Sequence, residues 1–442
     1  MKTTKEAAEI LGVSPRRIVA LLSEGVLAGE RVGKMWLVDE ASIARRLERA
    51  SNAGRPRLGS AACQTRFVLK NRTHSIMELV YDSDIREFTW AGPLIDSERA
   101  PLGLAMERDH ITLPSFNVWW KNRGIPEGRA GVERLLEEAG VSVPSELAVR
   151  SLGLSLSDQY WLQPEGSDIE WRDVNFFMND FEDVRVASWE GDSARHPDNT
   201  SDGNLPKHWI IGPDGTRILL KGGIHANQEP HNEVVATALH RRIVPGGSYV
   251  AYWLEHLDDG PASACAAFVR DDEEYVPAVY VASHFRRPPH RSEYQHYVAC
   301  CQELGIEEVE DALSHMIVCD DILANTDRHA RNYGVIRNVE TLEYRIAPLF
   351  DSGTSLWCTK DLYDLRRGDY SFEGKQFKSS PAKQLMLAGD LSWLDVSALD
   401  GFVDEAMGIL AQNERIQDRL EHIRRALEFR VERMVTIREA LG

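Results

Sequence analysis

The sequence predicts an α+β protein of two lobes, with an antiparallel sheet in the N-terminal lobe and helices in the C-terminal lobe. Short β-prone runs separated by turn-forming residues lie between residues 209 and 270. After residue 290, apolar residues recur at helical spacing, as at Leu420, Ile423 and Leu427. A small winged helix-turn-helix is expected in front of these lobes, because the first 50 residues indicate short helices and a hairpin.

The composition is that of an ordinary globular protein. The chain has 442 residues, 43% hydrophobic and 27% charged, which is enough for two or three domains. The six cysteines show no CxxC or zinc spacing, and no stretch reaches the ~20 apolar residues of a membrane helix. The charged start of the chain does not resemble a signal peptide, so we expect a cytoplasmic protein with reduced thiols and no membrane partner.

Charge is distributed unevenly along the chain. The net charge is −18, but residues 1–60 hold 11 Lys/Arg against 7 Asp/Glu, whereas the remainder holds 40 against 62. A basic head on an acidic body is typical of a small nucleic-acid-binding domain attached to a larger protein.

The head has the pattern of a helix-turn-helix followed by a wing. Thr4 is expected to cap a first helix that Gly12 ends, and Ser14 is expected to cap a second helix. Residues 27–38 then indicate a β-hairpin, and a third helix follows.

This pattern resembles the excisionase and MerR-like winged helix-turn-helix domains. The resemblance implies that the second helix, with Arg16 and Arg17 near its start, enters the major groove of DNA. It also implies that Arg31 and Lys34 on the wing contact phosphates. A protein-interaction domain that uses the same fold is the alternative.

Residues 51–60 indicate a basic linker, because they are rich in turn formers and lack periodicity. Gly54-Arg55-Pro56 is also similar to the core of a minor-groove hook, in which arginines enter a narrow A·T groove. We therefore expect a DNA-binding domain at 1–50, the linker at 51–60, an N-terminal lobe at 61–270 and a helical C-terminal lobe at 271–442.

The strongest chemical signal is the run Asn325-Thr326-Asp327-Arg328-His329-Ala330-Arg331-Asn332, followed by Asp351-Ser352-Gly353. Phosphoryl transfer uses an Asp and an Asn at this spacing and a second metal-binding Asp from a later turn. Two β-prone runs between Asn332 and Asp351 predict a hairpin that returns Asp351 to Asn332. Oxygen ligands of this kind suit Mg²⁺. The alternative is that Asp327 caps a turn and that the other two are polar loop residues.

The segments NTDRHARN and PLFDSGTS resemble the HipA-like serine/threonine kinases, known as toxin components of bacterial toxin–antitoxin pairs. The resemblance covers about residues 200–358 and implies the fold shared by protein kinases and phosphatidylinositol kinases. It implies that Asp327 is the catalytic base, that Asn332 and Asp351 hold Mg²⁺, and that His329 is structural. The D-R-H-x-x-N order is also similar to phosphatidylinositol kinases, so the substrate class stays open.

A kinase also needs a strand lysine that contacts the nucleotide phosphates and a helical glutamate that pairs with it. Lys221 ends an apolar run, and Glu233 lies in the first turn of an expected helix. A solvated strand end and a favourable charge at a helix N-terminus are the alternatives for these two residues.

The turn-rich stretch before Lys221 is expected to cover the phosphates. Backbone N–H groups around Ser201, Asp202 and Gly203 can cradle an anion. The stretch resembles the HipA-like loop that carries an autophosphorylated serine, which implies Ser201 as the acceptor and Thr200 as the second candidate. An ordinary surface loop is the alternative.

The order of the strands places the adenine-binding hinge at Phe268, Val269 and Arg270. Residues 372–388, with three lysines that include Lys375, are either a substrate-facing segment or an ordinary loop. Residues 61–200 are expected to complete the N-terminal lobe, with their aromatic side chains in its core.

Together these signals predict an ATP- and Mg²⁺-dependent kinase that phosphorylates a Ser or Thr of a protein, with autophosphorylation and a DNA-binding head. A toxin–antitoxin role rests on the resemblance alone, and the fused head departs from HipA-like toxins, which rely on a separate DNA-binding antitoxin. The alternatives are a transcription regulator whose kinase-like domain senses nucleotide, and a small-molecule or lipid-type kinase.

Overall fold

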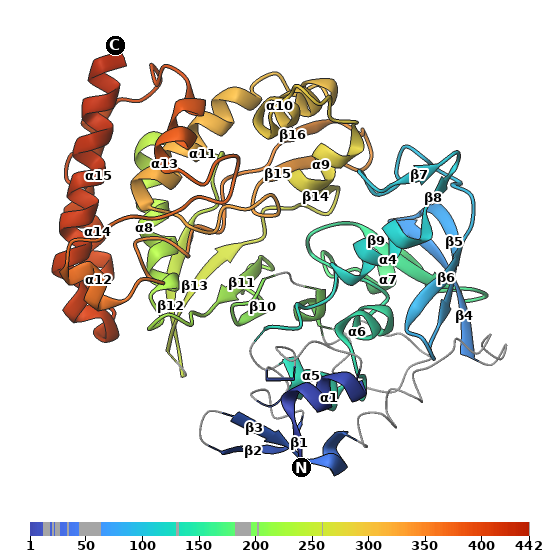
Figure 1. The fold of residues 1–442 in the computed structure, drawn as a ribbon. Helices are drawn as coiled ribbons and strands as arrows, with labels where there is room; N and C mark the ends of the chain where they lie inside the picture. Colours follow the sequence, from blue (N-terminus) through green and yellow to red (C-terminus); the bar gives the residue numbers. More distant parts are fainter. Residues whose placement is uncertain are drawn as a thin grey trace. The chain divides into compact units, whose positions relative to one another are not determined.

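The chain divides into two compact units, Met1–Cys63 and Gln64–Gly442 (Figure 1). The predicted linker at 51–60 lies outside the residues that the structure describes, and the predicted lobe boundary at residue 270 stays a prediction. The structure, a computed structural model, describes residues 1–11, 18–19, 22, 27–32, 35–43, 63–129, 132–181, 196–200, 203–258 and 260–441.

The first unit contains a three-stranded sheet and the helix α1, Thr4–Leu11. The sheet has the order β1-β3-β2 and is antiparallel, so the predicted wing hairpin is present. Its strands are β1 Lys2–Thr3, β2 Gly29–Val32 and β3 Met35–Val38. A small apolar core holds the unit together: Ala7, Ala8, Ile18, Leu22, Leu27, Val38 and Ile43.

The predicted helix cap and one of the predicted DNA contacts can be located in this unit. The cap of α1 is Thr3 rather than Thr4, because Glu6 N–H donates to Thr3 Oγ1 and Thr3 N–H donates to Glu6, which closes a capping box. Arg31 is exposed on β2. The predicted DNA contacts Arg16, Arg17 and Lys34 lie outside the described residues.

The second unit begins with a four-stranded antiparallel sheet of order β6-β5-β4-β9. Its inner face packs on helices through a core rich in Phe and Trp, so the prediction that the aromatics of this region are core residues is confirmed. The elements are β4 Gln64–Asn71, β5 His74–Asp82, β6 Glu87–Ala91, β7 Met106–Glu107, β8 His110–Ile111, α4 Leu113–Lys121, α5 Val132–Glu138, α6 Pro144–Arg150, β9 Tyr160–Pro164 and α7 Trp171–Val174.

A second four-stranded antiparallel sheet follows, of order β10-β11-β13-β12, with α8 packed against it. The β-prone runs predicted between residues 209 and 270 are present as the four strands of this sheet. The elements are the 3₁₀ helix η3 Pro197–Thr200, β10 Lys207–Ile211, β11 Arg217–Lys221, α8 Glu229–Ile243, β12 Tyr252–Leu257 and β13 Gly260–Ala266.

The rest of the second unit is mainly helical, with one three-stranded sheet of order β14-β15-β16. In Figure 1 the last helix, α15, lies beside α14 and α12, and it contacts both of them. The elements are β14 Glu273–Pro277, α9 Ala278–His284, α10 Glu293–Glu303, α11 Val309–Leu323, β15 Gly334–Asn338, β16 Tyr344–Ile346, α12 Leu362–Arg366, α13 Pro381–Leu385, η4 Met386–Ala388, η5 Val396–Leu399, α14 Phe402–Leu410, η6 Glu414–Arg419 and α15 Leu420–Leu441.

The predicted α+β class is confirmed, with antiparallel sheets preceding a helical C-terminal region. The predicted hairpin between Asn332 and Asp351 is also present, as β15 and β16. No helix in the described part of the chain has the length and apolarity that a membrane crossing needs. None of the six cysteines is in a disulfide.

Candidate active site

A cavity of about 620 Å³ lies in the second unit. It is lined by residues of β10, β11 and β13, by the loops that surround β15 and β16, and by residues from the segment 101–160. Eight of the predicted site residues line it: Thr200, Gly203, Lys221, Phe268, Val269, Asp327, Asn332 and Asp351. Residues more than 100 positions apart in the sequence are therefore collected around one space.

The loop that carries Asp327 follows directly from α11. Ala324 ends this helix in a left-handed conformation, with φ of 52°. Asp327 N–H donates to Asn325 Oδ1 at 2.9 Å, and Asn332 Nδ2 donates to the backbone oxygen of Asp327 at 3.0 Å. These contacts hold the Asp and the Asn at the two ends of one compact turn.

The buried side chain of Arg328 stabilises this turn through an ion pair and several hydrogen bonds. Its buried guanidinium pairs with Asp320, with Nε and Oδ2 3.0 Å apart. It also donates to the backbone oxygens of Asn332 and Phe350 and to Ser352 Oγ. Arg328 therefore ties the loop of Asp327 to the turn that carries Asp351. This role of Arg328 was not predicted from the sequence, although the residue directly follows Asp327.

Asp351 lies in a sharp turn after β16, with φ of 59°. An Asp tolerates this left-handed conformation better than most residues do. Ser352 N–H donates to Glu233 Oε2 at 2.9 Å, which ties the turn to α8. Gly353 lies against the same helix, because an added Cβ would come within 3.3 Å of Glu233 Oε1. The Asp-Ser-Gly sequence thus fits its surroundings at each position.

Lys221 at the end of β11 contacts both Glu233 and Asp351. The distance from Lys221 Nζ to Glu233 Oε1 is 2.5 Å, and Nζ also donates to Asp351 Oδ1. Burial opposes the charged form of the lysine, but the two carboxylates outweigh it and raise the pKa of Lys221 well above its usual value. Burial likewise opposes the Asp351 carboxylate, yet Lys221 and Lys207 hold the pKa of Asp351 below its usual range.

The predicted hinge is divided between two environments. Phe268 and Val269 line the cavity, and the Phe268 ring packs against Phe350 with the centroids 5.0 Å apart. Arg270 is absent from the described lining, and its guanidinium pairs instead with Asp272 and Glu273. Phe268 and Phe350 therefore give the cavity an aromatic surface at the predicted adenine position, and the predicted role of the Phe268–Arg270 backbone as a hinge stays a prediction.

The loop before β10 is described only in part. Gly203 lines the cavity with φ of 95°, a conformation that favours glycine. Thr200 also lines it, but its side chain is buried and donates from Oγ1 to the backbone oxygen of Leu154 at 2.7 Å. Ser201 and Asp202 lie outside the described residues.

Two lysines in or beside the cavity were not assigned to it from the sequence. Lys207 lies opposite Lys221 in the register of β10 and β11, and both line the cavity. Lys375 Nζ lies 2.5 Å from Asp327 Oδ1, so the segment at 372–388 does reach the predicted base. Gln376 from the same segment donates to Asp320. Strand register and the course of a long loop are not visible in local sequence patterns.

Comparisons with known proteins agree with this architecture. Residues 3–51 match the family model of a helix-turn-helix domain. The HipA structure from the Shewanella oneidensis MR-1 toxin–antitoxin complex of HipA, HipB and operator DNA superposes with a TM-score of 0.51. That superposition covers 84% of this chain and 99% of HipA at 16% sequence identity. The chain therefore shares its fold with that HipA structure.

Two further similarities are more limited. A segment of 46 residues is 46% identical to the serine/threonine-protein kinase CtkA of Helicobacter pylori, and it spans 14% of that protein and 10% of this chain. The crystal structure of the Helicobacter pylori proinflammatory kinase CtkA superposes with a TM-score of 0.42 at 16% identity, over 55% of this chain and 92% of CtkA.

The chemistry available in this HipA-like fold follows from the charges around the cavity. Lys221 and Lys207 provide cations, and Asp351 and Asp327 provide carboxylates, with Lys221 paired directly to Asp351. The cavity volume falls within the range of about 300–1,000 Å³ that is typical of small-molecule and cofactor sites. Cations, oxygen ligands and an aromatic surface are the three components that a nucleoside polyphosphate and its metal require.

Proposed function

We propose that this protein is a kinase that transfers the γ-phosphate of ATP to a Ser or Thr hydroxyl of a protein. The observation that carries the proposal is the convergence of Lys221, Asp327, Asn332 and Asp351 on one cavity, with Lys221 paired to Glu233. A turn-capping role for Asp327 alone would not bring the other side chains to the same space.

In this proposal Asp327 orients the acceptor hydroxyl and accepts its proton. Its carboxylate is partly exposed, so an incoming side chain can reach it. Lys221 contacts the phosphates, and Glu233 holds its ammonium in place. Phe268 and Val269 provide the surface for the adenine ring.

The residues around Asp351 fit a magnesium ion. Mg²⁺ prefers a few hard oxygen ligands and retains several waters. Asp351 offers a carboxylate with a pKa below its usual range, and Asn332 offers an amide oxygen on the same cavity. When bound there, Mg²⁺ would neutralise charge on the phosphates.

The first unit adds a DNA-binding function to the proposal. This is supported by the helix-turn-helix match at residues 3–51 and by the positive charge of residues 1–60. Arg31 on the wing is accessible to a phosphate, and Arg16 and Arg17 are the candidates for base contacts. We propose that the head brings the kinase to an operator sequence. The HipA neighbour was solved together with HipB and operator DNA, whereas here the helix-turn-helix domain is on the same chain, and a toxin role is not part of the proposal.

The proposal is tested by incubating the full chain with Mg²⁺ and ATP labelled at the γ-phosphate, followed by mass spectrometry. Phosphate on Ser201 or Thr200 of the chain, lost in Asp327→Asn, is the expected result. Asp369→Asn is the matched control, because Asp369 also pairs with a lysine, Lys360, at 2.9 Å.

Other outcomes distinguish the alternatives. ATP binding without turnover, equal in the native protein and in Asp327→Asn, would support a nucleotide-sensing regulator. Turnover that needs a small-molecule or lipid acceptor, with no phosphate on any protein, would support the second alternative. Co-purification of partners with Asp327→Asn from the native host would identify a protein substrate.

A further inference from the structure

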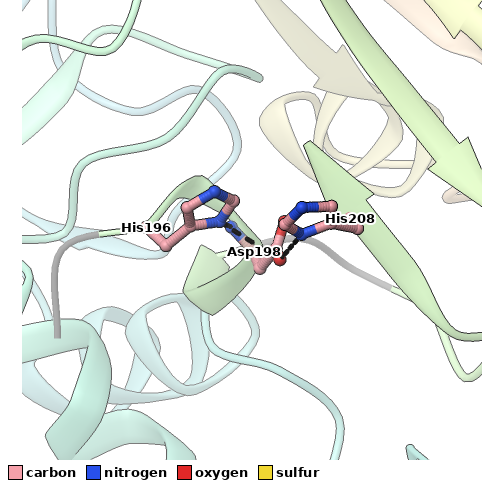
Figure 2. Close-up of side chains that lie close together, drawn as sticks. All are labelled: His196, Asp198 and His208. Carbon is pink, nitrogen blue, oxygen red and sulfur yellow. Dashed lines mark hydrogen bonds and ion pairs between the residues drawn. The ribbon is translucent and has the colours of Figure 1, made fainter. Parts of the chain in front are cut away.

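A group of three side chains with metal-ligand chemistry lies beside the loop that precedes β10. Figure 2 shows His196 and His208 on either side of the Asp198 carboxylate. Asp198 Oδ2 lies 3.1 Å from His196 Nδ1 and 2.7 Å from His208 Nδ1. The three ligand atoms all lie within 4.8 Å of one another. None of these residues has a role in the proposed phosphoryl transfer.

The composition of the group favours zinc over magnesium. Two imidazoles and one carboxylate are ligands that Zn²⁺ accepts, whereas Mg²⁺ prefers oxygen atoms. Neighbouring ligands of a tetrahedral Zn²⁺ lie roughly 3.3 Å apart, given zinc–ligand distances of about 2.0–2.2 Å. The Asp198–His196 separation is close to this value and the Asp198–His208 separation is shorter, so His208 has to move outward when an ion replaces the shared hydrogen bonds. Three protein ligands leave the fourth position for water.

The surroundings hold the three ligands in place. Trp209 N–H donates to Asp198 Oδ1 at 2.7 Å, which leaves Oδ2 directed at the two rings. The His196 and His208 rings are stacked with an angle of 8° between their planes, and Phe181 packs edge-on against His196. Contacts of this kind orient metal ligands in natural sites.

A second group among the described residues, His225, Glu229 and Cys358, is a weaker candidate. Burial raises the pKa of the Cys358 thiol to about 12, and only the thiolate is a good zinc ligand. Glu229 is also tied to His225 by a 2.5 Å hydrogen bond at the edge of the proposed nucleotide cavity.

We propose that His196, Asp198 and His208 form a binding site for a transition-metal ion, with Zn²⁺ as the best fit. His196 and Asp198 lie at one end of the loop, and His208 lies at the start of β10. Between them are Thr200, Gly203 and Lys207, which line the cavity. A bound ion would join the two ends of this loop and restrict it. Any consequence of this restriction for nucleotide binding rests on the proposed kinase function, whereas metal binding itself does not.

The site is tested by titrating the purified full chain with Zn²⁺ against a competing chelator, without nucleotide. The expected result is a zinc site whose affinity falls at least about 10- to 100-fold in His208→Gln and in His196→Gln, since loss of even an orienting group has that effect. His110→Gln is the matched control, because His110 Nδ1 also lies 2.7 Å from a carboxylate, Asp109, but has no second histidine beside it. We expect the native affinity in this control.

Equal zinc affinity in the native protein and in both variants would overturn the site, as would the absence of zinc binding. His208 is largely exposed, so its replacement by Gln leaves the fold intact, and thermal unfolding checks this. Co²⁺ provides a second measurement: the visible absorption of a tetrahedral Co²⁺ site should appear in the native protein and in His110→Gln but not in His208→Gln. The same spectrum in all three proteins would overturn the assignment.

The coupling to nucleotide is measured separately, as ATP affinity with and without one equivalent of Zn²⁺. A change of at least twofold that disappears in His208→Gln supports the restriction of the loop. Unchanged ATP affinity in the zinc-bound protein would overturn the coupling but not the metal site. Absence of ATP binding in every condition would count against the kinase proposal and leave the zinc titration valid.

Discussion

Asp320 and Asp327 lie seven residues apart, and each is paired with a basic side chain, but the two pairs differ in their access to water. The Asp320 and Arg328 side chains are 6% and 1% exposed, whereas Asp327 and Lys375 are 33% and 56% exposed. A buried pair is costly to break because the remaining charge has no water, while an exposed pair contributes little. The first pair therefore supports the loop, and the second leaves Asp327 able to change partners.

The largest expected effect is on catalysis, from Asp327→Ala. Loss of a general base typically lowers turnover by about 10²–10⁴-fold. ATP affinity should change little, because Asp327 is proposed to act on the acceptor hydroxyl and not on the nucleotide. Initial rates and equilibrium ATP binding measure the two effects. If the variant keeps native turnover, Asp327 is a turn residue, and the exposure of the Asp327–Lys375 pair has no role in catalysis.

The next effect is on stability, from Arg328→Met. The substitution leaves the Asp320 carboxylate buried without its cation, which typically costs about 3–5 kcal/mol of unfolding free energy. Urea unfolding measures this loss. Arg425→Met is the control, because Arg425 pairs with Glu421 on the exposed surface of α15 and should contribute less than about 1 kcal/mol. Equal losses in the two variants would show that burial of the Asp320 pair is not important.

A smaller effect is expected from Lys375→Met. Because both partners are partly exposed, the loss of unfolding free energy should stay below about 1 kcal/mol. Any change in turnover should stay within about tenfold, which corresponds to ~1.4 kcal/mol. Unfolding and rate measurements on the same preparation check both. A loss as large as that of Arg328→Met would mean that Lys375 is part of the framework of the loop.

The smallest expected effect on catalysis comes from deletion of residues 1–58. ATP turnover should remain within about twofold, because the cavity is built from the second unit alone. Salt-dependent DNA binding should disappear, since neutralised phosphates release counterions and make affinity fall with salt. Binding titrations at two salt concentrations measure this. Loss of turnover in the truncated protein would make the head part of the enzyme.

Local patterns predicted the parts of the site that depend on short stretches of chain. The β15–β16 hairpin, the helix that carries Glu233 and the strand that ends at Lys221 all follow from periodicity and turn residues. The helix begins earlier than predicted, at Glu229, so Glu233 lies beyond its first turn. The family resemblance then indicated which side chains belong together. The cap at Thr3 was assigned to Thr4, one residue away, because both threonines have the chemistry of a cap.

Contacts between distant segments could not be predicted in this way. β9 pairs with β4 across more than 80 residues, and buried Arg337 on β15 pairs with Glu274 on β14 at 2.6 Å. The position of Lys375 at Asp327 and the grouping of His196 with His208 depend equally on the tertiary fold. Local sequence carries hydrophobic period and turn chemistry, and such pairings are selected only when the whole core packs.

The placement of Lys207 opposite Lys221 has a consequence for ligand binding. Both ammonium groups line the cavity beside the Asp351 carboxylate, and β10 is the edge strand of its sheet in the described strand order. A polyanion that contacts both lysines would link this edge strand to β11 through the ligand, in addition to the backbone hydrogen bonds between the two strands. Ligand binding would then slow hydrogen exchange at the amides of β10, and the apparent melting temperature would rise with nucleotide concentration.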